Sequence, residues 1–119
     1  MLSYLSEEES DALEVSALIH EMGKKAVRLP GDIGSLGYAK GLVAAAIKEF
    51  GHLDIVVNNP GFQMTHDDIE EIPAEEFEHT FRTNVFGTFF LTQAALPKMA
   101  PGPQLLTQRR FRHLILESN

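Results

Sequence analysis

Apolar and polar positions follow two different periods along this chain. Three short stretches, 2–5, 25–29 and 53–57, are rich in apolar or β-branched residues and are typical of strands. The segments 6–22 and 36–50 instead carry apolar residues at every third or fourth position, which predicts two amphipathic helices. Because the run 53–57 is almost uniformly apolar, we expect a strand that is covered on both faces of a parallel sheet.

Residues with special backbone or capping properties mark the ends of these helices. Ser6 and Glu9 have the spacing of a capping box, in which Ser6 is the N-cap and the Glu9 side chain returns to its amide. Gly23 and Gly51 follow the last apolar residue of each helix and can take the left-handed conformation that ends a helix. The segment 30–32 then turns the chain away from its second strand.

A third helix is predicted from Pro73 to about Pro97, after an acidic loop at 63–72. Apolar residues mark one of its faces, and Phe86, Phe89 and Phe90 add apolar surface on others, so this helix needs a second partner besides the sheet. The order strand, helix, strand, helix, strand implies right-handed crossovers. The pattern therefore predicts a doubly wound α/β layer.

Composition limits the classes of function. The 119 residues suit one domain, and their formal net charge of −7 argues against a nucleic-acid or acidic membrane surface, which needs a basic face. The chain has no cysteine, which excludes disulfides and thiolate metal sites and suits a reducing, cytoplasmic compartment. Its beginning lacks the pattern of a signal peptide, and no stretch is long enough to span a membrane. A small, neutral or cofactor-like ligand fits these properties better.

Metal-ligating side chains form no clear cluster in the sequence. The five histidines are scattered without a pair at metal-ligand spacing, so we expect no metal site. The acidic residues of 67–71 could bind a hard cation, although a loop that faces water is the commoner structure for such a run. Tyr38 and Lys40 lie near the start of a helix, which places them on an outer layer of the fold.

Polar residues or glycine follow each predicted strand. In an open α/β sheet the ligand crevice lies beyond the carboxyl ends of the strands, so these positions are candidates for binding. They are the segment 4–6, then Asp32 and Ile33, then Asn59, Pro60 and Gly61. Asp32 could equally begin a helix, and Asn-Asn-Pro-Gly is also an ordinary turn sequence, so both alternatives stay open.

Two ordered motifs carry a resemblance to a known family. Asn58-Asn59-Pro60-Gly61 ends the apolar run 53–57, and Asn84 follows within the segment 83–87. This order resembles the short-chain dehydrogenases/reductases, which carry Asn-Asn-Ala-Gly and then an Asn-Val pair at comparable spacing. The resemblance implies an α/β fold with a partial doubly wound, Rossmann-like parallel sheet that lacks the first strand and the strands after the fourth.

The resemblance also implies an NAD- or NADP-dependent oxidoreductase that interconverts small alcohols and carbonyl compounds. By this resemblance, Asp32 and Ile33 hold the adenine, and Asn59, Pro60 and Gly61 pass beside the ribose and the nicotinamide. Pro60 stands where the family has alanine. A proline removes one backbone donor and biases Asn59 towards an extended conformation.

Asn84 is the one catalytic candidate that the resemblance supplies. The family's serine, its Tyr-x-x-x-Lys motif and its glycine-rich dinucleotide fingerprint have no counterpart in this sequence. Asn84 would then be the remnant of a proton relay, and the alternative is a buried amide at a local kink. We therefore expect a truncated enzyme that is inactive alone.

The resemblance divides the chain into two parts. Residues 1–102 resemble the central part of a dinucleotide-binding domain, whereas 103–119 show no clear family pattern and are compatible with a frameshift near Gly102. Without a central strand, the fold is expected to depend on self-association, as a homo-oligomer through the helix Phe77–Met99. The rival interpretation is a non-catalytic assembly module that uses the same helix.

Overall fold

The computed structural model describes residues 1–62, 64–99, 101–102 and 104–107. The main elements are, in chain order, β1 Leu2–Tyr4, α1 Glu9–Glu21, β2 Arg28–Pro30, α2 Leu36–Phe50, β3 Ile55–Asn58, α3 Ala74–Phe81, α4 Thr88–Ala95 and β4 Gln104–Thr107. Shorter helical turns are η1 Ser6–Glu8, η2 Ile69–Glu71, the π-helical turn η3 Arg82–Gly87, and η4 Leu96–Lys98. Residues 108–119, which make up most of the predicted tail 103–119, lie outside the described residues.

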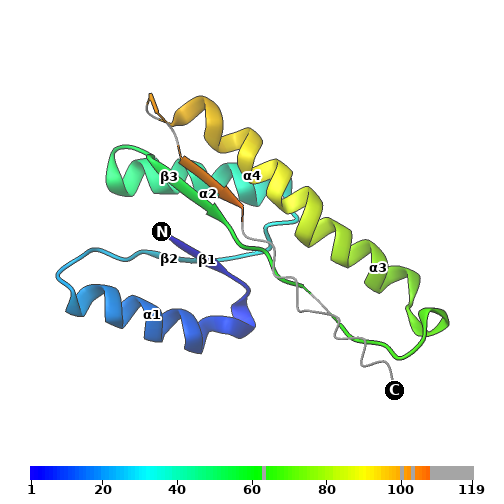
Figure 1. Ribbon diagram of the computed structural model, residues 1–119. Helices are drawn as coiled ribbons and strands as arrows, with labels where there is room; N and C mark the ends of the chain where they lie inside the picture. Colours follow the sequence, from blue (N-terminus) through cyan, green and yellow to red (C-terminus); the bar gives the residue numbers. More distant parts are fainter. Residues whose placement is uncertain (63, 100, 103, 108–119) are drawn as a thin grey trace, which may run out of the picture.

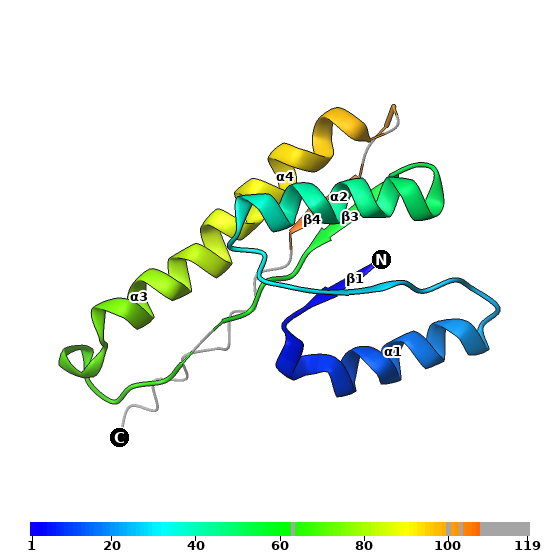
Figure 2. The same cartoon turned by 180° about the vertical axis from the view of Figure 1, so that it is seen from behind.

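The strands form two separate two-stranded parallel sheets (Figure 1). β1 pairs with β2 in a register that sets Leu2 opposite Arg28, and β3 pairs with β4 in a register that sets Ile55 opposite Gln104. In both views of the ribbon, β1 and β3 run in the same direction (Figures 1 and 2). The predicted α/β class with a partial, doubly wound parallel sheet is confirmed.

β4 extends this sheet beyond the sequence prediction. The prediction placed no strand after 53–57, whereas Gln104–Thr107 pairs with β3 along its whole length. Four residues are too few to show the alternation of a strand in the sequence, so β4 is defined by its backbone pairing with β3 and not by its local pattern. The remainder of the predicted tail, 108–119, is not among the described residues.

α2 has the bounds that the sequence predicts. The Ser35 side chain accepts a hydrogen bond from the Tyr38 amide at 3.3 Å, which satisfies one free donor of the first turn. At the other end, Gly51 has a φ of 81° and donates its N–H to the Ile47 carbonyl at 2.7 Å. Glycine takes this left-handed conformation without a steric penalty, so the stop is encoded locally.

α1 begins differently from the prediction. The capping carboxylate is that of Glu8, which accepts from the Leu5 amide at 3.0 Å, and Ser6 already lies in the turn η1. Glu9 is not free to cap, because its carboxylate accepts from the Tyr4 hydroxyl and pairs with Arg28 at 2.6 Å. The predicted capping box at Ser6 and Glu9 is therefore wrong. The stop at Gly23, with a φ of 72°, is as predicted.

The apolar face of α1 is mostly exposed. Its buried residues are Ala12 and Ser16, whereas Val15, Leu18 and Met22 are exposed. α1 lies against the β1–β2 sheet and away from β3 (Figure 2). A sheet of two short strands offers too little surface to cover a whole helix face.

β3 is covered on one face, which corrects the prediction of a strand buried on both. Val56 and Asn58 are buried, whereas Ile55 and Val57 are 54% and 55% exposed. Successive side chains of a strand point to opposite faces, so one face meets α2 and α4, whereas within the described residues the other face leaves Ile55 and Val57 exposed. The apolar sequence of β3 would suit a strand covered on both faces, but α1 packs against the β1–β2 sheet and not against β3.

The third helix runs from α3 through the π turn η3 into α4 and η4. Pro73 precedes α3 as its N-cap residue, with a φ of −66°. The predicted single apolar face divides in two: Phe77 and Phe81 are exposed, whereas Leu91 and Ala95 are buried. The change occurs at η3, where the extra residue of each π turn rotates the following side chains around the axis.

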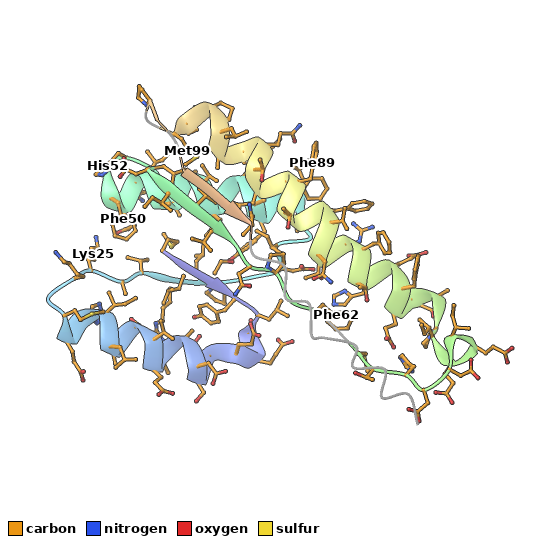
Figure 3. The ribbon with its side chains drawn as sticks, in the orientation of Figure 1. Lys25, Phe50, His52, Phe62, Phe89 and Met99 are labelled. Atoms are coloured by element: carbon orange, nitrogen blue, oxygen red, sulfur yellow. The ribbon has the colours of Figure 1, made fainter. Side chains whose placement is uncertain are left out.

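The core lies between α2, α4 and the covered face of β3. Its buried residues are Leu42, Val43, Val56, Leu91 and Ala95. Phe50 and His52 lie at one end of this layer, and Met99 closes it beside α4 (Figure 3). This core positions β3, and therefore the residues that follow it.

Candidate functional site

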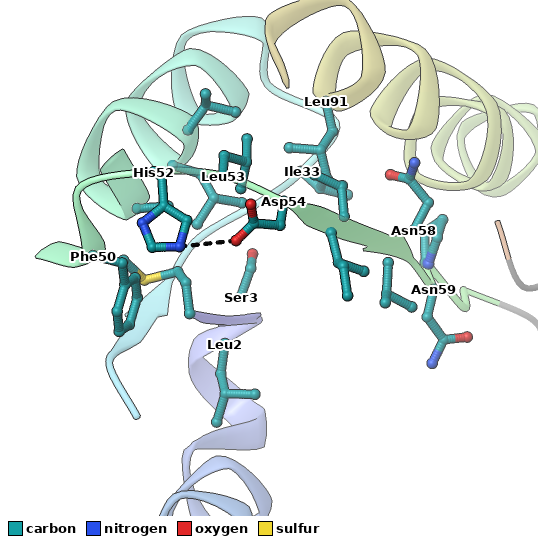
Figure 4. Close-up of a pocket in the computed structure, with 18 of the residues that line it drawn as sticks. Leu2, Ser3, Ile33, Phe50, His52, Leu53, Asp54, Asn58, Asn59 and Leu91 are labelled. Atoms are coloured by element: carbon teal, nitrogen blue, oxygen red, sulfur yellow. Dashed lines mark ion pairs between the residues drawn. The ribbon is translucent and has the colours of Figure 1, made fainter. Parts of the chain in front are cut away.

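A cavity of about 840 Å³ lies between the two sheets. Leu2 and Ser3 of β1 line one side, and the whole of β3 with the following Asn59 lines the other (Figure 4). Its floor is formed by core side chains of the helices, Leu42, Val43 and Leu91. We call this cavity the inter-sheet groove. Its volume is in the range of ligand pockets, about 300–1,000 Å³.

Asp32 and Ile33 follow β2 and lie at the carboxyl end of the strands. One carboxylate oxygen of Asp32 accepts from the Gly34 amide at 2.8 Å, so Asp32 closes a turn ahead of α2 while its side chain faces solvent. Ile33 points inward against Gly87, where an added Cβ would lie 2.7 Å from the Ile33 Cγ2. This close approach of the loop and η3 requires glycine at position 87.

The segment after β3 places its residues in different environments. Asn58 is 2% exposed and its Nδ2 donates to the Thr92 hydroxyl at 3.3 Å. Asn59 is exposed on the groove wall, next to Pro60. A Cβ added at Gly61 would meet no atom within 4 Å, so this glycine leaves open space in front of the backbone.

Asn84 holds the loop after Gly61 to the third helix. Its Nδ2 donates to the Phe62 carbonyl at 2.8 Å, and its Oδ1 accepts from the Phe62 amide at 3.1 Å. Asn84 lies in the π turn η3, and its own carbonyl accepts from the Thr88 hydroxyl at 3.0 Å. The half-buried Asn84 side chain therefore binds both backbone groups of a single residue, Phe62.

Three supporting contacts are absent from the sequence prediction. The first is the hydrogen bond of the buried Asn58 to Thr92. The alternation of side chains along β3 could have predicted that Asn58 is buried, because it shares a face with Val56. His66 and Glu76 form a half-buried pair at 2.8 Å, and the Phe62 ring meets the His79 ring edge-on with centroids 4.2 Å apart. Neither pair has a signal in the sequence, because a loop of variable path joins the partners.

The Tyr38 side chain makes its hydrogen bonds to β1 and β2 and not to the residues that follow the strands. Its hydroxyl donates to the Leu29 carbonyl at 2.6 Å and lies 2.8 Å from the Ser3 hydroxyl. Burial raises the pKa of Tyr38, and the hydrogen bond with Ser3 opposes that shift. A raised pKa keeps the phenol protonated, so the structure gives Tyr38 a role in joining α2 to β2.

The structure brings part of the predicted site together. Ile33, Asn59 and Pro60 line the inter-sheet groove, whereas Asp32 and Gly61 are not among its lining residues. Asn84 reaches this region through Phe62. Within the described residues, no group of three metal-ligating side chains is close enough to hold an ion, and no helix has the length and apolar character to cross a membrane.

A family model described as Enoyl-(Acyl carrier protein) reductase matches residues 1–114. The chain belongs to the short-chain dehydrogenase/reductase family. The uncharacterized oxidoreductase YghA of Escherichia coli strain K12 is 43% identical over 106 residues, which are 89% of this chain and 36% of that protein.

Two further relatives show how much of a dehydrogenase/reductase the chain spans. The chloroplastic NADPH-dependent aldehyde reductase 1 of Arabidopsis thaliana is 35% identical over 104 residues, 84% of this chain and 36% of its own length. A short-chain dehydrogenase from Burkholderia cenocepacia J2315, solved in complex with NADP, superposes with a TM-score of 0.82 at 24% identity. That match covers 88% of this chain and 42% of the solved one. The chain therefore spans about a third of the length of the curated relatives it matches.

Proposed function

We propose that this chain forms part of a nicotinamide-dinucleotide-dependent oxidoreductase that interconverts alcohols and carbonyl compounds. One observation carries the proposal: Asp32 and the segment 59–61 follow parallel strands at their carboxyl ends and present exposed hydrogen-bonding groups there. The oxidoreductase names of the relatives support the reaction class. A reducing compartment such as the cytoplasm suits a chain without cysteine.

The residues at the strand ends fit part of a dinucleotide. The exposed Asp32 carboxylate can accept hydrogen bonds from hydroxyl or amino groups of the adenosine half, and the Asn59 amide can both donate and accept. The open space at Gly61 lets a ligand approach the backbone closely. When bound, the dinucleotide supplies the hydride acceptor or donor, and these residues of the chain bind and orient it.

Asn84 acts in this proposal as a positioning residue. By holding both backbone groups of Phe62, it fixes the exit of the 59–61 segment relative to η3. The 119 residues contain no tyrosine followed four positions later by lysine, the pair that the family uses for proton transfer. We therefore propose that this chain, assayed on its own, binds a dinucleotide without turning over a substrate.

Calorimetric titration with NADH and NADPH tests the proposal. We expect binding with a dissociation constant of micromolar order, about −8 kcal/mol, and no oxidation of either dinucleotide with aldehyde or ketone substrates. Asp32→Asn keeps the oxygen that binds Gly34 but removes the charge, and should weaken binding about tenfold, because hydrogen bonds to charged groups contribute roughly 1.5–3 kcal/mol. Asp11→Asn, on the exposed side of α1, is the matched control. No binding of either dinucleotide up to about 1 mM, or equal losses in both variants, would contradict the proposal.

An exposed aromatic face favours a second candidate function, self-assembly. Phe77, Phe81, Val85 and Phe89 recur at intervals of four along the third helix and are 57%, 44%, 49% and 59% exposed. Phe89 points away from the sheet (Figure 3). Apolar surface of this extent on one helix is typical of an interface between proteins. We propose that the chain forms homo-oligomers through Phe77–Met99.

Sedimentation of the chain and of two variants tests the second candidate. Phe89→Glu places a charge on the face and should shift the chain to monomer at concentrations where the unmodified chain associates. Leu13→Glu changes a residue of similar exposure, 49%, on α1 and should leave association unchanged. A concentration-independent monomer of the unmodified chain would exclude self-assembly without affecting the dinucleotide proposal.

A further inference from the structure

We propose that the π turn η3 positions the Asp32 carboxylate for the dinucleotide, and that Gly34 and Gly87 are positioning residues because they let the 32–34 turn dock on η3. This role rests on the proposed function, in which Asp32 binds the adenosine half of the dinucleotide. Both glycines are buried, whereas Asp32 is exposed. The carboxylate therefore meets solvent on a turn whose third residue is held inside the fold.

The 32–34 turn contacts both ends of η3. At the first residue of η3, a Cβ added at Gly34 would lie 2.8 Å from the Arg82 Cγ and 3.3 Å from the Arg82 carbonyl oxygen. At the last residue, a Cβ added at Gly87 would lie 2.7 Å from the Ile33 Cγ2 and 3.2 Å from the Ile33 carbonyl oxygen. In both ribbon views, the segment that follows β2 meets the third helix between α3 and α4 (Figures 1 and 2). Each contact therefore needs a glycine on one side.

The π geometry of η3 places these two contacts on one side of the helix. Arg82 and Gly87 are the first and last residues of η3, and in a regular α-helix two residues at this spacing lie roughly 140° apart around the axis. The i→i+5 hydrogen bonds of a π turn bring such residues one above the other, as residues four apart are in an α-helix. One short turn can therefore meet both. A regular helix through this segment would direct one of the two contacts away from the turn.

Local hydrogen bonds determine the shape of the 32–34 turn but not its place in the site. An Asp32 carboxylate oxygen accepts from the Gly34 amide at 2.8 Å, and the Asp32 carbonyl accepts from the Ser35 amide at 3.0 Å. These groups all belong to one stretch of four residues, which could move as a unit. The contacts with η3 are what connect this stretch to the segment after β3.

The same π turn holds the segment after β3. Asn84, inside η3, binds the amide and the carbonyl of Phe62 at 3.1 and 2.8 Å. Asp32 follows the β1–β2 sheet and Asn59 follows the β3–β4 sheet, and within the described residues no strand pairing joins the two sheets. Contacts with η3 therefore set the distance between the two proposed binding groups. A preformed distance favours a ligand that spans both, because less order has to be created on binding.

Amide hydrogen exchange of the free chain tests the docking without a ligand. Gly87→Ala places a methyl group against Ile33 and should displace the turn, so the Gly34 amide should exchange at least about tenfold faster. The amides of α2 are the internal reference, because a general loss of stability would accelerate them by the same factor. Gly41→Ala is the matched control: Gly41 is exposed on α2, and a Cβ there would meet no atom within 4 Å. It should leave the Gly34 rate unchanged.

A double-mutant cycle on NADH binding, measured by calorimetry, tests the positioning of Asp32. Asp32→Asn and Gly87→Ala should each weaken binding about tenfold in the otherwise unmodified chain. Once the turn is displaced, the carboxylate no longer reaches the ligand, so Asp32→Asn should cost less than about twofold in the Gly87→Ala background. A merely structural glycine would leave the two losses independent, and their factors would multiply. Gly41→Ala should bind NADH as the unmodified chain does.

Arg82 offers a test in which the fold is not at risk, because its side chain is exposed. Arg82→Ala removes the Cγ that lies along Gly34, whereas Arg82→Met keeps this carbon and removes only the charged end. The contact of the guanidinium with the Phe86 ring, 5.9 Å from its centroid, is lost in both, and both new residues are good helix formers. Arg82→Ala should bind NADH about threefold more weakly than Arg82→Met. If circular dichroism shows that Gly87→Ala does not fold, this pair decides alone.

Several outcomes would overturn the proposal. A Gly34 rate that stays unchanged in Gly87→Ala, or that rises by the same factor as the α2 amides, would mean that η3 does not hold the turn. An equal loss for Asp32→Asn in both backgrounds, or equal binding of Arg82→Ala and Arg82→Met, would mean that η3 does not position the carboxylate. If the unmodified chain binds neither NADH nor NADPH while Gly87→Ala still accelerates the Gly34 amide, the dinucleotide is not the ligand of this turn. That result would contradict the proposed function and leave only the docking on η3.

Discussion

The two halves of the described chain carry similar helical patterns but bury them to different extents. In α2, Leu42 and Val43 are each 6% exposed, whereas in α1 Leu13 and Leu18 are 49% and 52% exposed. α2 packs against α4 and the covered face of β3. α1 meets the narrow β1–β2 sheet. A hydrophobic period therefore predicts a helix, but the width of the opposing surface decides how much of its face is buried.

The same difference separates the two parallel sheets. β3 is anchored because Val56 enters the core, whereas no residue of β1 or β2 is fully buried. The β1–β2 sheet is instead stabilised by polar contacts, in which Glu9 accepts from Tyr4 and pairs with Arg28. Such partly exposed contacts contribute less than apolar burial, so we expect the α1 half to open before the α2 half.

Leucine-to-alanine substitutions in α1 and α2 should show the largest difference in stability between the two halves. Leu42→Ala removes a buried side chain and should lower the free energy of unfolding by about 2–5 kcal/mol, through lost burial and the cavity that remains. Leu18→Ala, in α1, should change it by no more than about 0.5 kcal/mol. Urea unfolding followed by circular dichroism measures both. Equal losses would show that α1 is covered in solution.

The two asparagines after β3 give a smaller and sharper contrast. Asn58→Ala removes a buried amide and leaves the Thr92 hydroxyl without its donor, so the free energy of unfolding should fall by about 1–3 kcal/mol. Asn59→Ala changes an exposed residue and should stay within about 0.5 kcal/mol. The same urea experiment compares them. A larger loss in Asn59→Ala would mean that the loop packs differently.

The fold was predictable where local sequence determines it. The bounds of α2 follow from its period and from Gly51, whose left-handed conformation needs no tertiary contact. The uncovered face of β3 was not predictable, because Ile55 and Val57 have the same character as buried strand residues and their exposure depends on where α1 lies. β4 was missed for a related reason, since its four residues gain their strand character from pairing with β3.

The candidate site was predictable as positions but not as contacts. The rule that ligands lie beyond the carboxyl ends of strands selects Asp32 and Asn59 from the order of elements alone. It does not reveal that Asp32 also closes a turn on Gly34, or that Asn84 brackets Phe62. The contact of Asp32 is a local turn, whereas that of Asn84 depends on how the segment after β3 meets the π turn η3, and neither has a period that the sequence displays.

Titration of the two tyrosines, one from each half of the described chain, is the test with the smallest expected effect. The hydrogen bond to Glu9 is the main cause that raises the pKa of Tyr4, and burial raises the pKa of Tyr38. A raised folded-state pKa means that the stabilising contribution is complete below the ordinary value near 10 and is lost as the pH rises through the folded value. The chain has two tyrosines and no tryptophan, so phenolate absorbance reports both groups directly. Glu9→Gln should move one transition back towards the ordinary value and leave the other unchanged. If both transitions move, α1 and α2 are coupled through the β1–β2 sheet, and the two halves do not behave independently.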